Sequence, residues 1–404
     1  MNALYKNIPQ IRFPGFSGDW VEKKLGDCIN IFNGYAFSSS DSLAQGTKWV
    51  KIADVGIKNM KYDNVSYLPT DYLEKYSKFA LQKGDYVVAL TRPFLNHKLK
   101  IAKIDDFFHN SLLNQRVGKL ESTQNKTLMY YLLQKSDLTN AMENSIAGSD
   151  PPNLSPNEIK SIKISLPALP EQEKIADFLS DVDSKIEKLS RKKDLMSEYK
   201  KGVMQKIFSQ EIRFKDEDGN YYPDWVEKKL GDVCHFFSGG TPTSTNKKYY
   251  CGDIPFIKSG EINALATSQF ITQEAMDSSS AKLVKKDDLL YALYGATSGT
   301  VGISKINGAI NQAVLCIRTD ESKLFIKEYL QLRKQDIINT FLQGGQGNLS
   351  AQIVKKLKIN LPCLDEQKKI AEFLTNLDKK IENIDTELKA VKEFKKGLLQ
   401  TMFV

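Results

Sequence analysis

The chain has 404 residues, of which 41% are hydrophobic and 26% are charged, as expected for a globular protein of two or three domains. Its 57 basic and 49 acidic residues leave a net charge of +8, which fits a polyanionic partner but is also ordinary for a globular protein. No apolar run approaches the roughly 18 residues that a membrane helix needs, and the N-terminus has no apolar core of the signal-peptide type. We therefore expect a cytoplasmic protein with no membrane partner. Scattered histidines and five distant cysteines without a C-x-x-C pair predict neither a metal site nor a disulfide framework.

The most informative feature of the sequence is an internal repeat. Residues 19–27 return letter for letter at 224–232, and residues 166–189 return at 361–384 with more than half of the positions identical. Between these anchors the two copies differ strongly. We expect a first variable domain, a first repeated segment, a second variable domain and a second repeated segment, at residues 1–165, 166–210, 211–360 and 361–404. Two equivalent modules on one chain predict a pseudo-twofold molecule that binds something bipartite.

Each variable domain contains short β-branched and aromatic runs bounded by glycine, serine and asparagine. The strands that we expect lie at 49–52, 86–90, 254–257, 289–293 and 313–317, and the helices at 126–134 and 322–334. This pattern predicts α+β domains with twisted, mostly antiparallel sheets.

The repeated segments have the pattern of long helices. Pro170 suits a first helical turn, Glu171 follows it near the positive end of the helix dipole, and Asp365 is a good N-cap in the second copy. Apolar residues then fall seven apart: Ile175, Val182, Leu189, Met196 and Val203 in one copy, and Ile370, Leu377, Ile384, Val391 and Leu398 in the other. We expect a coiled coil of two antiparallel helices, each roughly 55 Å long. The alternative is two surface helices, each packed on its own domain.

Motifs for catalysis and for cofactors are missing from the sequence. The segment 150–153, Asp-Pro-Pro-Asn, is close to an adenine methyltransferase loop, but Asn153 stands where an aromatic residue would stack on a flipped base. The second copy has Gly-Gln-Gly-Asn at 345–348, which indicates a turn. Neither a dinucleotide-binding nor an ATP-binding glycine motif occurs before a helix. We expect no catalytic residue and no bound cofactor.

Two pairs of loops are candidates for contacts to nucleic acid. The first pair begins at residues 32 and 237, where hydroxyls, lysines and backbone amides would hold phosphate and Asn246 would pair with adenine. Its candidates are Tyr35, Ser38 and Ser39 in the first half, and Gly240, Thr241, Thr243, Ser244, Asn246, Lys247 and Lys248 in the second half. A solvent-exposed loop without such a role is the alternative.

The second pair follows the central strand of each half. Its candidates are Thr91, Arg92, Asn96, Lys98 and Lys100, and in the other half Tyr294, Thr297, Ser298 and Thr300. The two loops occupy one slot of the repeat but differ completely, as independent readers of two sequences would. Arg92 is the best candidate for a guanine contact, and a structural ion pair is the competing interpretation. The lysine pairs at 192–193, 200–201 and 395–396 predict a solvated helix face, and contact with DNA or a partner along the coiled coil is the alternative.

Three segments together resemble the specificity subunits of type I restriction-modification enzymes. They are Ile-Arg-Phe-Pro-Gly-Phe at 11–16 with Asp-Trp at 19–20, the twice-written Leu-Pro-x-Leu-x-Glu-Gln-x-Lys-Ile-Ala-x-Phe-Leu, and Gly-Gly-Thr-Pro at 239–242. The resemblance covers essentially the whole chain. It implies two target recognition domains separated by an antiparallel helical spacer, each reading one half of a bipartite, asymmetric site in double-stranded DNA. The first half lacks the Gly-Gly-Thr-Pro loop, so its contacts transfer less directly.

The resemblance also implies partners that carry the chemistry. Two modification subunits would bring S-adenosylmethionine and methylate adenine, and two restriction subunits would use ATP and magnesium. The chain itself would be a non-catalytic part of this restriction system. One alternative is a recognition subunit for a fused restriction-methylation polypeptide, which a neighbouring gene for a separate methyltransferase would exclude. The other is a non-catalytic two-lobed coiled-coil adaptor, for which protein pairing would be insensitive to salt.

Overall fold

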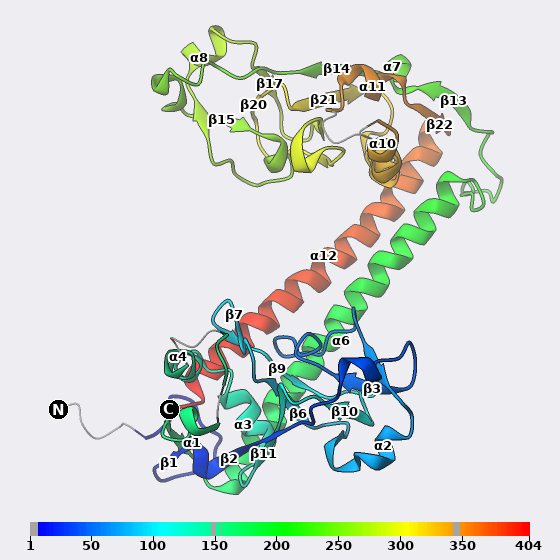
Figure 1. The fold of residues 1–404 in the computed structure, drawn as a ribbon. Helices are drawn as coiled ribbons and strands as arrows, with labels where there is room; N and C mark the ends of the chain where they lie inside the picture. The colour runs from blue at the N-terminus through cyan, green and yellow to red at the C-terminus, as the bar shows by residue number, and fades with distance from the viewer. Residues whose placement is uncertain (1–6, 147–150, 155, 342–347) are drawn as a thin grey trace. The chain divides into compact units, whose positions relative to one another are not determined.

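A computed structural model describes residues 7–146, 151–154, 156–341 and 348–404. The chain divides into two compact units, one made of Met1–Leu189 with Glu387–Val404 and the other of Ser190–Thr386. Figure 1 shows that each unit combines a globular α+β part with portions of two long helices. The methyltransferase-like loop and its counterpart lie partly outside the described residues, at Asp150 and at 345–347.

The globular part of the first unit contains two four-stranded sheets. The first sheet is antiparallel in the order β2 (Ile29–Asn33), β11 (Val117–Ser122), β6 (Tyr86–Ala89) and β9 (Ile101–Lys103). The second has the order β4 (Ser66–Leu68), β3 (Thr47–Val50), β10 (Ser111–Leu113) and β5 (Ala80–Leu81), and its β3 and β10 run parallel. Two helices, α3 (Lys126–Leu132) and α4 (Ser136–Ser145), follow β11 along the chain.

The second unit repeats this topology strand for strand. One sheet has the order β14 (Cys234–Ser238), β21 (Val314–Thr319), β18 (Leu289–Ala292) and β19 (Val301–Ile303). The other has the order β16 (Phe270–Ile271), β15 (Ile254–Ile257), β20 (Gly308–Ile310) and β17 (Lys282–Val284), with β15 parallel to β20. The helices α9 (Lys323–Leu332) and α10 (Lys334–Phe341) follow β21. The predicted duplication of a mostly antiparallel α+β domain is therefore confirmed.

The repeated short anchor forms a two-stranded ribbon in each unit. β1 (Val21–Lys24) pairs with β12 (Lys163–Leu166), and β13 (Val226–Lys229) pairs with β22 (Lys358–Leu361). Since β12 and β22 immediately precede the long helices, each ribbon ties the beginning of a domain to the point where its helix begins.

The long helices are α6 (Leu169–Phe208, 40 residues) and α12 (Leu364–Thr401, 38 residues). In the first unit Lys185 Nζ lies 3.0 Å from Glu387 Oε1, and in the second Lys193 Nζ lies 2.5 Å from Asp385 Oδ1. A second pair in each unit, Asp183 with Lys395 in the first and Lys200 with Asp378 in the second, gives the direction. Within each unit the α12 partner falls in number as the α6 residue rises, so the helix portions are antiparallel. Seven of the ten predicted heptad residues are buried, while Met196, Val203 and Val391 are half-buried.

The repeated glutamate and glutamine explain why each helix begins where it does. Glu171 is 1% exposed and accepts two 2.7 Å hydrogen bonds from Arg12, while Glu366 is fully buried and accepts two 3.0 Å bonds from Arg213. Buried carboxylates need such partners because burial of an unpaired charge is costly. The first turn of each helix is thereby fixed to its own domain.

The neighbouring glutamines make a second repeated contact. Gln172 accepts a hydrogen bond from the backbone N–H of Asn125, and Gln367 accepts one from that of Ser322, both at 3.0 Å. Asn125 and Ser322 are the N-caps of α3 and α9. The amide of each glutamine therefore joins the long helix to the beginning of a domain helix.

The lysine pairs are only partly exposed to solvent. The prediction of a solvated face is wrong for Lys200 and for Lys395, one member each of two pairs. Lys200 and Lys395 are 5% and 4% exposed, and Lys200 Nζ lies 2.6 Å from Asp378 Oδ1 and 2.7 Å from the buried Glu328. Lys395 contacts Asp183. The reason is that each lysine meets a carboxylate on the other long helix, a partner that lies far away in sequence.

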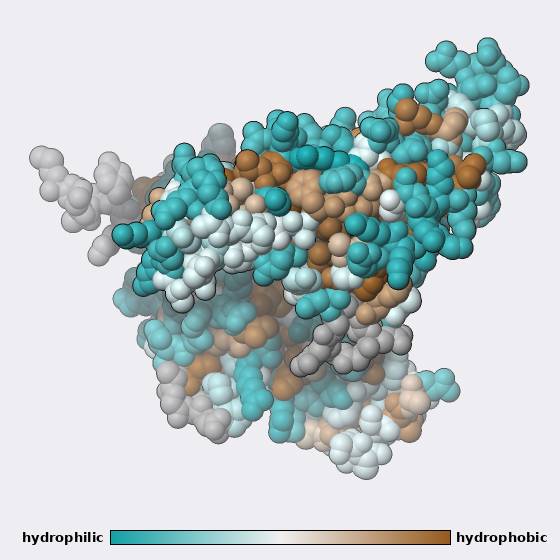
Figure 2. Space-filling model, turned by 90° about the horizontal axis from the view of Figure 1, so that it is seen from above, coloured by the Kyte–Doolittle hydropathy of each residue, from teal (hydrophilic) through white to brown (hydrophobic). Residues whose placement is uncertain are grey.

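The described helices include none with an apolar stretch long enough to cross a bilayer. Figure 2 shows one face of the molecule, on which hydrophilic residues surround scattered hydrophobic ones.

Candidate nucleic-acid interface

The slot after the central strand of the first unit contains a tight hairpin. Between β6 and β9, the strands β7 (Phe94–Leu95) and β8 (Lys98–Leu99) are joined by Asn96 and His97, with φ of 51° and 58°. Two successive positive φ angles are typical of a type I′ turn, which asparagine tolerates. His97 Nδ1 lies 2.9 Å from Glu143 Oε2 on α4, so the tip is anchored to the domain. Asn96 and Lys98 are exposed.

Arg92 begins this hairpin in a left-handed conformation, with φ of 48°. Its backbone N–H donates to the carbonyl of Pro152 at 2.8 Å, and the adjacent Thr91 hydroxyl donates to Asn153 Oδ1 at 2.7 Å. The guanidinium is exposed and makes no hydrogen bond or ion pair with the residues that the structure describes. The competing interpretation, a structural ion pair, has no partner among them.

Positive charge gathers around the same hairpin. Burial lowers the pKa of Lys100, and the nearby charges of Lys61 and Arg92 lower it further. Since like charges repel, a site that holds these cations together stabilises a bound anion. Lys98 adds a further exposed ammonium group at the hairpin tip.

The equivalent slot of the second unit has a different construction. Between β18 and β19 it contains the single 3-10 turn η5 (Gly295–Thr297) in place of a hairpin. The hydroxyl of the buried Ser298 donates to the carbonyls of Leu293 and Gly295, and Thr300 accepts a 2.9 Å hydrogen bond from Lys334 Nζ. These two predicted contacts are thus engaged in shaping their own loop. Thr297 donates to the carbonyl of Tyr294 at 3.5 Å.

The glycine pair of the second unit brings its loop against the sheet. A Cβ at Gly239 would lie 1.7 Å from the carbonyl oxygen of Ile310, and one at Gly240 would lie 1.9 Å from the hydroxyl of Ser280. Only glycine permits this close approach. Past the glycines, the Tyr250 hydroxyl donates to the carbonyl of Pro242 at 2.6 Å and closes the loop.

Asn246 and Thr241 use their side chains inside this loop. Asn246 Oδ1 accepts from the N–H of Lys248 and caps the 3-10 helix η3 (Lys247–Tyr250), while Thr241 donates to Gln312 Oε1 at 2.6 Å. Thr243 and Lys248 are exposed. The predicted adenine contact at Asn246 therefore has its NH₂ group and one lone pair of Oδ1 left for a ligand.

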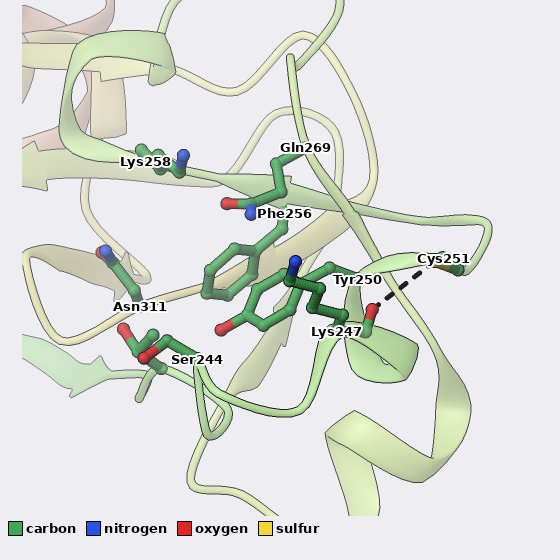
Figure 3. A pocket seen from close by; sticks show the side chains of 9 residues that line it. Ser244, Lys247, Tyr250, Cys251, Phe256, Lys258, Gln269 and Asn311 are labelled. Carbon is green, nitrogen blue, oxygen red and sulfur yellow. Dashed lines mark hydrogen bonds between the residues drawn. The ribbon is translucent and has the colours of Figure 1, made fainter.

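Beneath the loop lies a pocket of about 540 Å³ (Figure 3). Its lining residues are Thr241, Ser244, Lys247, Tyr250, Cys251, Phe256, Lys258, Gln269 and Asn311. Two lysines and no carboxylate line it, so it favours an anionic or hydrogen-bonding ligand. Thr241, Ser244 and Lys247 were predicted as contacts, whereas Lys258, Gln269 and Asn311 were not. Asn311 belongs to a short Asn-Gln echo of the repeat, but no pattern in the sequence singles out Gln269.

The corresponding loop of the first unit is filled with aromatic rings. Tyr35 lies 4.7 Å from Tyr76 and 4.9 Å from Phe37 between ring centroids, and Phe37 lies 5.9 Å from Trp49. Ser38 accepts from the N–H of Ser40, and Ser39 is exposed. Tyr35 is therefore largely a packing residue, although 39% of its surface stays exposed.

Comparison with known proteins shows the family of the chain. The model of the type I restriction modification DNA specificity domain matches the chain twice, at residues 17–196 and 222–393. The specificity subunit of the type I restriction enzyme MjaVIII of Methanocaldococcus jannaschii is 33% identical over 201 residues, which are 49% of this chain and 47% of that protein. The chain thus aligns with about half the length of that relative. The putative MjaX specificity subunit of the same organism is 24% identical over 95% of this chain and 92% of its own.

Two solved structures have the same fold. The S subunit of a type I restriction-modification system from M. genitalium aligns with a TM-score of 0.66 at 17% identity, over 98% of this chain and 99% of its own. A structure described for complex assembly and conformational transition of the type I R-M system aligns with a TM-score of 0.52 at 18% identity, over 98% of each chain.

Proposed function

Because the chain belongs to the family of type I restriction-modification DNA specificity domains, we propose that each of its two units reads one half of a bipartite, asymmetric DNA site. The observation that carries this proposal is that the two units have unlike loops between equivalent strands. The same sheet holds a cationic hairpin between β6 and β9 in one unit and the short turn η5 between β18 and β19 in the other. A constant scaffold with unlike loops suits two readers of unlike sequences.

The charges at these loops support DNA as the ligand. Arg92, Lys98 and Lys100 surround the hairpin of the first unit, and Lys247 and Lys258 line the pocket of the second. Lysine holds phosphate as a point charge, while the fork of an arginine matches the O6 and N7 atoms of guanine. Contacts of both kinds are needed, because phosphate contacts position a protein and base contacts specify the sequence.

The remaining parts of the chain fit a spacer and a docking platform. The paired portions of α6 and α12 would set the distance between the half-sites, as element geometry sets half-site spacing in other DNA-binding proteins. The modification subunits would bind S-adenosylmethionine and methylate adenine, and the restriction subunits would use ATP and magnesium. In this cytoplasmic complex the present chain supplies recognition and no chemistry.

The test is selection of binding sites by the full-length chain from a pool of random duplex DNA. We expect enrichment of two short, different sequence blocks at a fixed separation, with binding that weakens steeply as salt rises. A matched pool of single-stranded DNA controls for binding to charge alone. Enrichment of a single block would contradict a bipartite site, and binding that ignores both sequence and salt would contradict the proposal and favour an adaptor.

A further inference from the structure

The pocket of the second unit is a local departure from the first unit. Trp49 and Phe256 occupy the same register position, because β3 pairs with β10 through Trp49 and Leu112, and β15 pairs with β20 through Phe256 and Ala309. Tyr35 and Gly240 are likewise each the second residue after an equivalent strand, β2 or β14. Where the first unit places a tyrosine ring, the second has no side chain and Ser280 approaches the backbone of Gly240 instead. The pocket lies beside this glycine loop, lined by Thr241, Ser244 and Phe256 among others.

Several polar groups reach this space without an internal partner. The side chains of Ser244, Lys247, Lys258 and Gln269 make no hydrogen bond or ion pair with other residues in the described ranges. Figure 3 shows the Gln269 amide beside the Phe256 ring, with Asn311 across the pocket. Gln269 is half-buried, so its amide is partly desolvated and has a ligand-facing donor and acceptor.

Comparison of the two units distinguishes pocket residues that have an identical counterpart in the first unit from those that do not. Lys258 stands two residues after Phe256, as Lys51 stands two residues after Trp49. A cation kept in both units suits a contact that is common to all DNA, the phosphate.

Asn311 is also shared, as Asn114 of the first unit. Each asparagine accepts a hydrogen bond from the N–H two residues further on, at 3.0 Å from Ala313 and 2.9 Å from Arg116. Its Oδ1 therefore shapes the turn after β20 or β10, and reading of a base falls to another residue.

Gln269 has no glutamine or asparagine at the equivalent position of the first unit. It lies opposite Phe256, whose N–H donates to its carbonyl at 2.8 Å, and Ser66 lies opposite Trp49 in the first unit. The two units therefore have the same strand pairing here, but the side chain at this position is the short hydroxyl of Ser66 in the first and the longer amide of Gln269 in the second. This is the property expected of a residue that reads sequence.

We propose that Gln269 is a specificity-determining residue of the second unit, whose amide reads an adenine while Lys247 and Lys258 hold the adjacent phosphates. A glutamine amide donates to N7 and accepts from the N6 amino group of adenine, a pair of bonds that distinguishes adenine from the other bases in the major groove. The inference rests on the proposed function, since it names the base contact of one half-site.

The experiment is selection from random duplex DNA by the full-length chain and by four variants. Gln269→Ala should lower the preference at one adenine of one half-site by about 5- to 150-fold, and leave the other block and the spacing intact. Gln269→Glu should move the preference at that position towards cytosine, whose N4 amino group donates to a carboxylate. Lys258→Ala should weaken binding alike on all sequences and flatten the salt dependence by about one unit of slope.

Gln273→Ala is the matched control, because Gln273 is exposed in the same unit and bonds Asp277 outside the pocket. It should retain the wild-type site. A wild-type site retained by both Gln269 variants would overturn the role of Gln269 and leave the proposed function standing. Failure of the wild-type chain to select any site would overturn the proposed function and this inference together.

Discussion

The ammonium nitrogen of Lys395 lies 2.5 Å from Oδ1 and 2.6 Å from Oδ2 of Asp183, and joins α12 to α6 in the first unit. The repeat places Lys200 and Asp378 in the same relation in the second unit, 2.6 Å apart. Each lysine is almost fully buried, and the carboxylate is an anionic partner of its ammonium group. Each ion pair therefore fixes the register of the two helix portions within its own unit.

Asp183→Ala should destabilise the chain by about 3 kcal/mol, since it leaves the buried ammonium of Lys395 without a carboxylate. The Tyr131 ring, whose centroid lies 4.9 Å from the Lys395 ammonium nitrogen, replaces little of this energy. Urea unfolding followed by circular dichroism measures the change. Asp181→Ala, an exposed aspartate on the same helix, should change stability by less than about 0.5 kcal/mol. Equal effects of the two substitutions would show that the ion pair does not hold the helices.

Arg92→Ala should weaken binding to the selected DNA site by about 1–3 kcal/mol and relax one position of one half-site. The physical reason is loss of a guanidinium that is exposed, positioned by the backbone bond of Arg92 to Pro152, and free to fork onto a guanine. Fluorescence anisotropy with matched and mismatched duplexes measures both effects, and Arg191→Ala on α6 is the arginine control. Equal loss on all sequences would assign Arg92 to phosphate, and no loss would assign it to the fold.

The cysteines should differ sharply in reactivity towards a maleimide. Cys251 is exposed at the edge of the pocket, whereas Cys316 is fully buried and its pKa is raised to about 12 by that burial. Since the thiolate is the reacting species, Cys251 should label in minutes and Cys316 only after unfolding. Bound duplex carrying the selected site should protect Cys251, as peptide mass mapping would reveal. Labelling that DNA does not slow would place the DNA away from the pocket.

Exchange of residues 212–360 for the matching domain of a relative should change one half of the recognised site and leave the other half and the spacing unchanged. Two separate hydrophobic cores support this independence, one around Tyr86 and Leu120 and the other around Tyr291 and Leu315. Sequencing of methylated sites in cells with the modification partner measures the result. A change in both halves would mean that the units do not read independently.

The sequence predicts the duplicated organisation and the helix pair well, because both depend on periodicity along the chain. It does not predict burial of Lys200 or Lys395, since their carboxylates lie on the other long helix and a heptad pattern carries no information about such a partner. It also misses α4 (Ser136–Ser145), whose ten residues contain few apolar side chains and depend on tertiary packing for their helical state.

The candidate site is predicted in part, and the reason is again physical. The loop residues Thr241, Ser244 and Lys247 are recognisable as a polar cluster beside glycines. Gln269 reaches the pocket only because β16 pairs with β15, and Lys258 because β15 ends there. Strand pairing between segments that are far from a loop in sequence cannot be inferred from the loop's own composition.

The two units pair equivalent aromatic rings near the end of a long helix, and the pair is buried in the first unit and half-buried in the second. Trp20 packs against Phe403 at 6.3 Å and 83°, and Trp225 packs against Phe208 at 6.4 Å and 81°. Phe208 and Phe403 are counterparts in the repeat, as are Met204 and Leu399. The end of α6 therefore contributes to the core of the second unit as the end of α12 contributes to the core of the first. A chain cut after residue 208 loses Phe403, which covers Trp20 in the full-length chain. It retains Phe208, a phenylalanine at the equivalent position of the repeat.

Residues 1–208 alone should therefore form a symmetric dimer in which the end of α6 of each copy covers Trp20 of the other. Association replaces a covalent link, so the dimer should dissociate on dilution, as sedimentation would measure. Phe208→Ala and Leu189→Lys should shift the equilibrium to monomer, whereas Tyr199→Ala, which alters a residue that is 54% exposed, should not. With modification subunits present, two identical readers facing opposite ways should methylate a palindrome built from the first half-site. A folded monomer that methylates the unchanged asymmetric site would refute the model of duplicated readers.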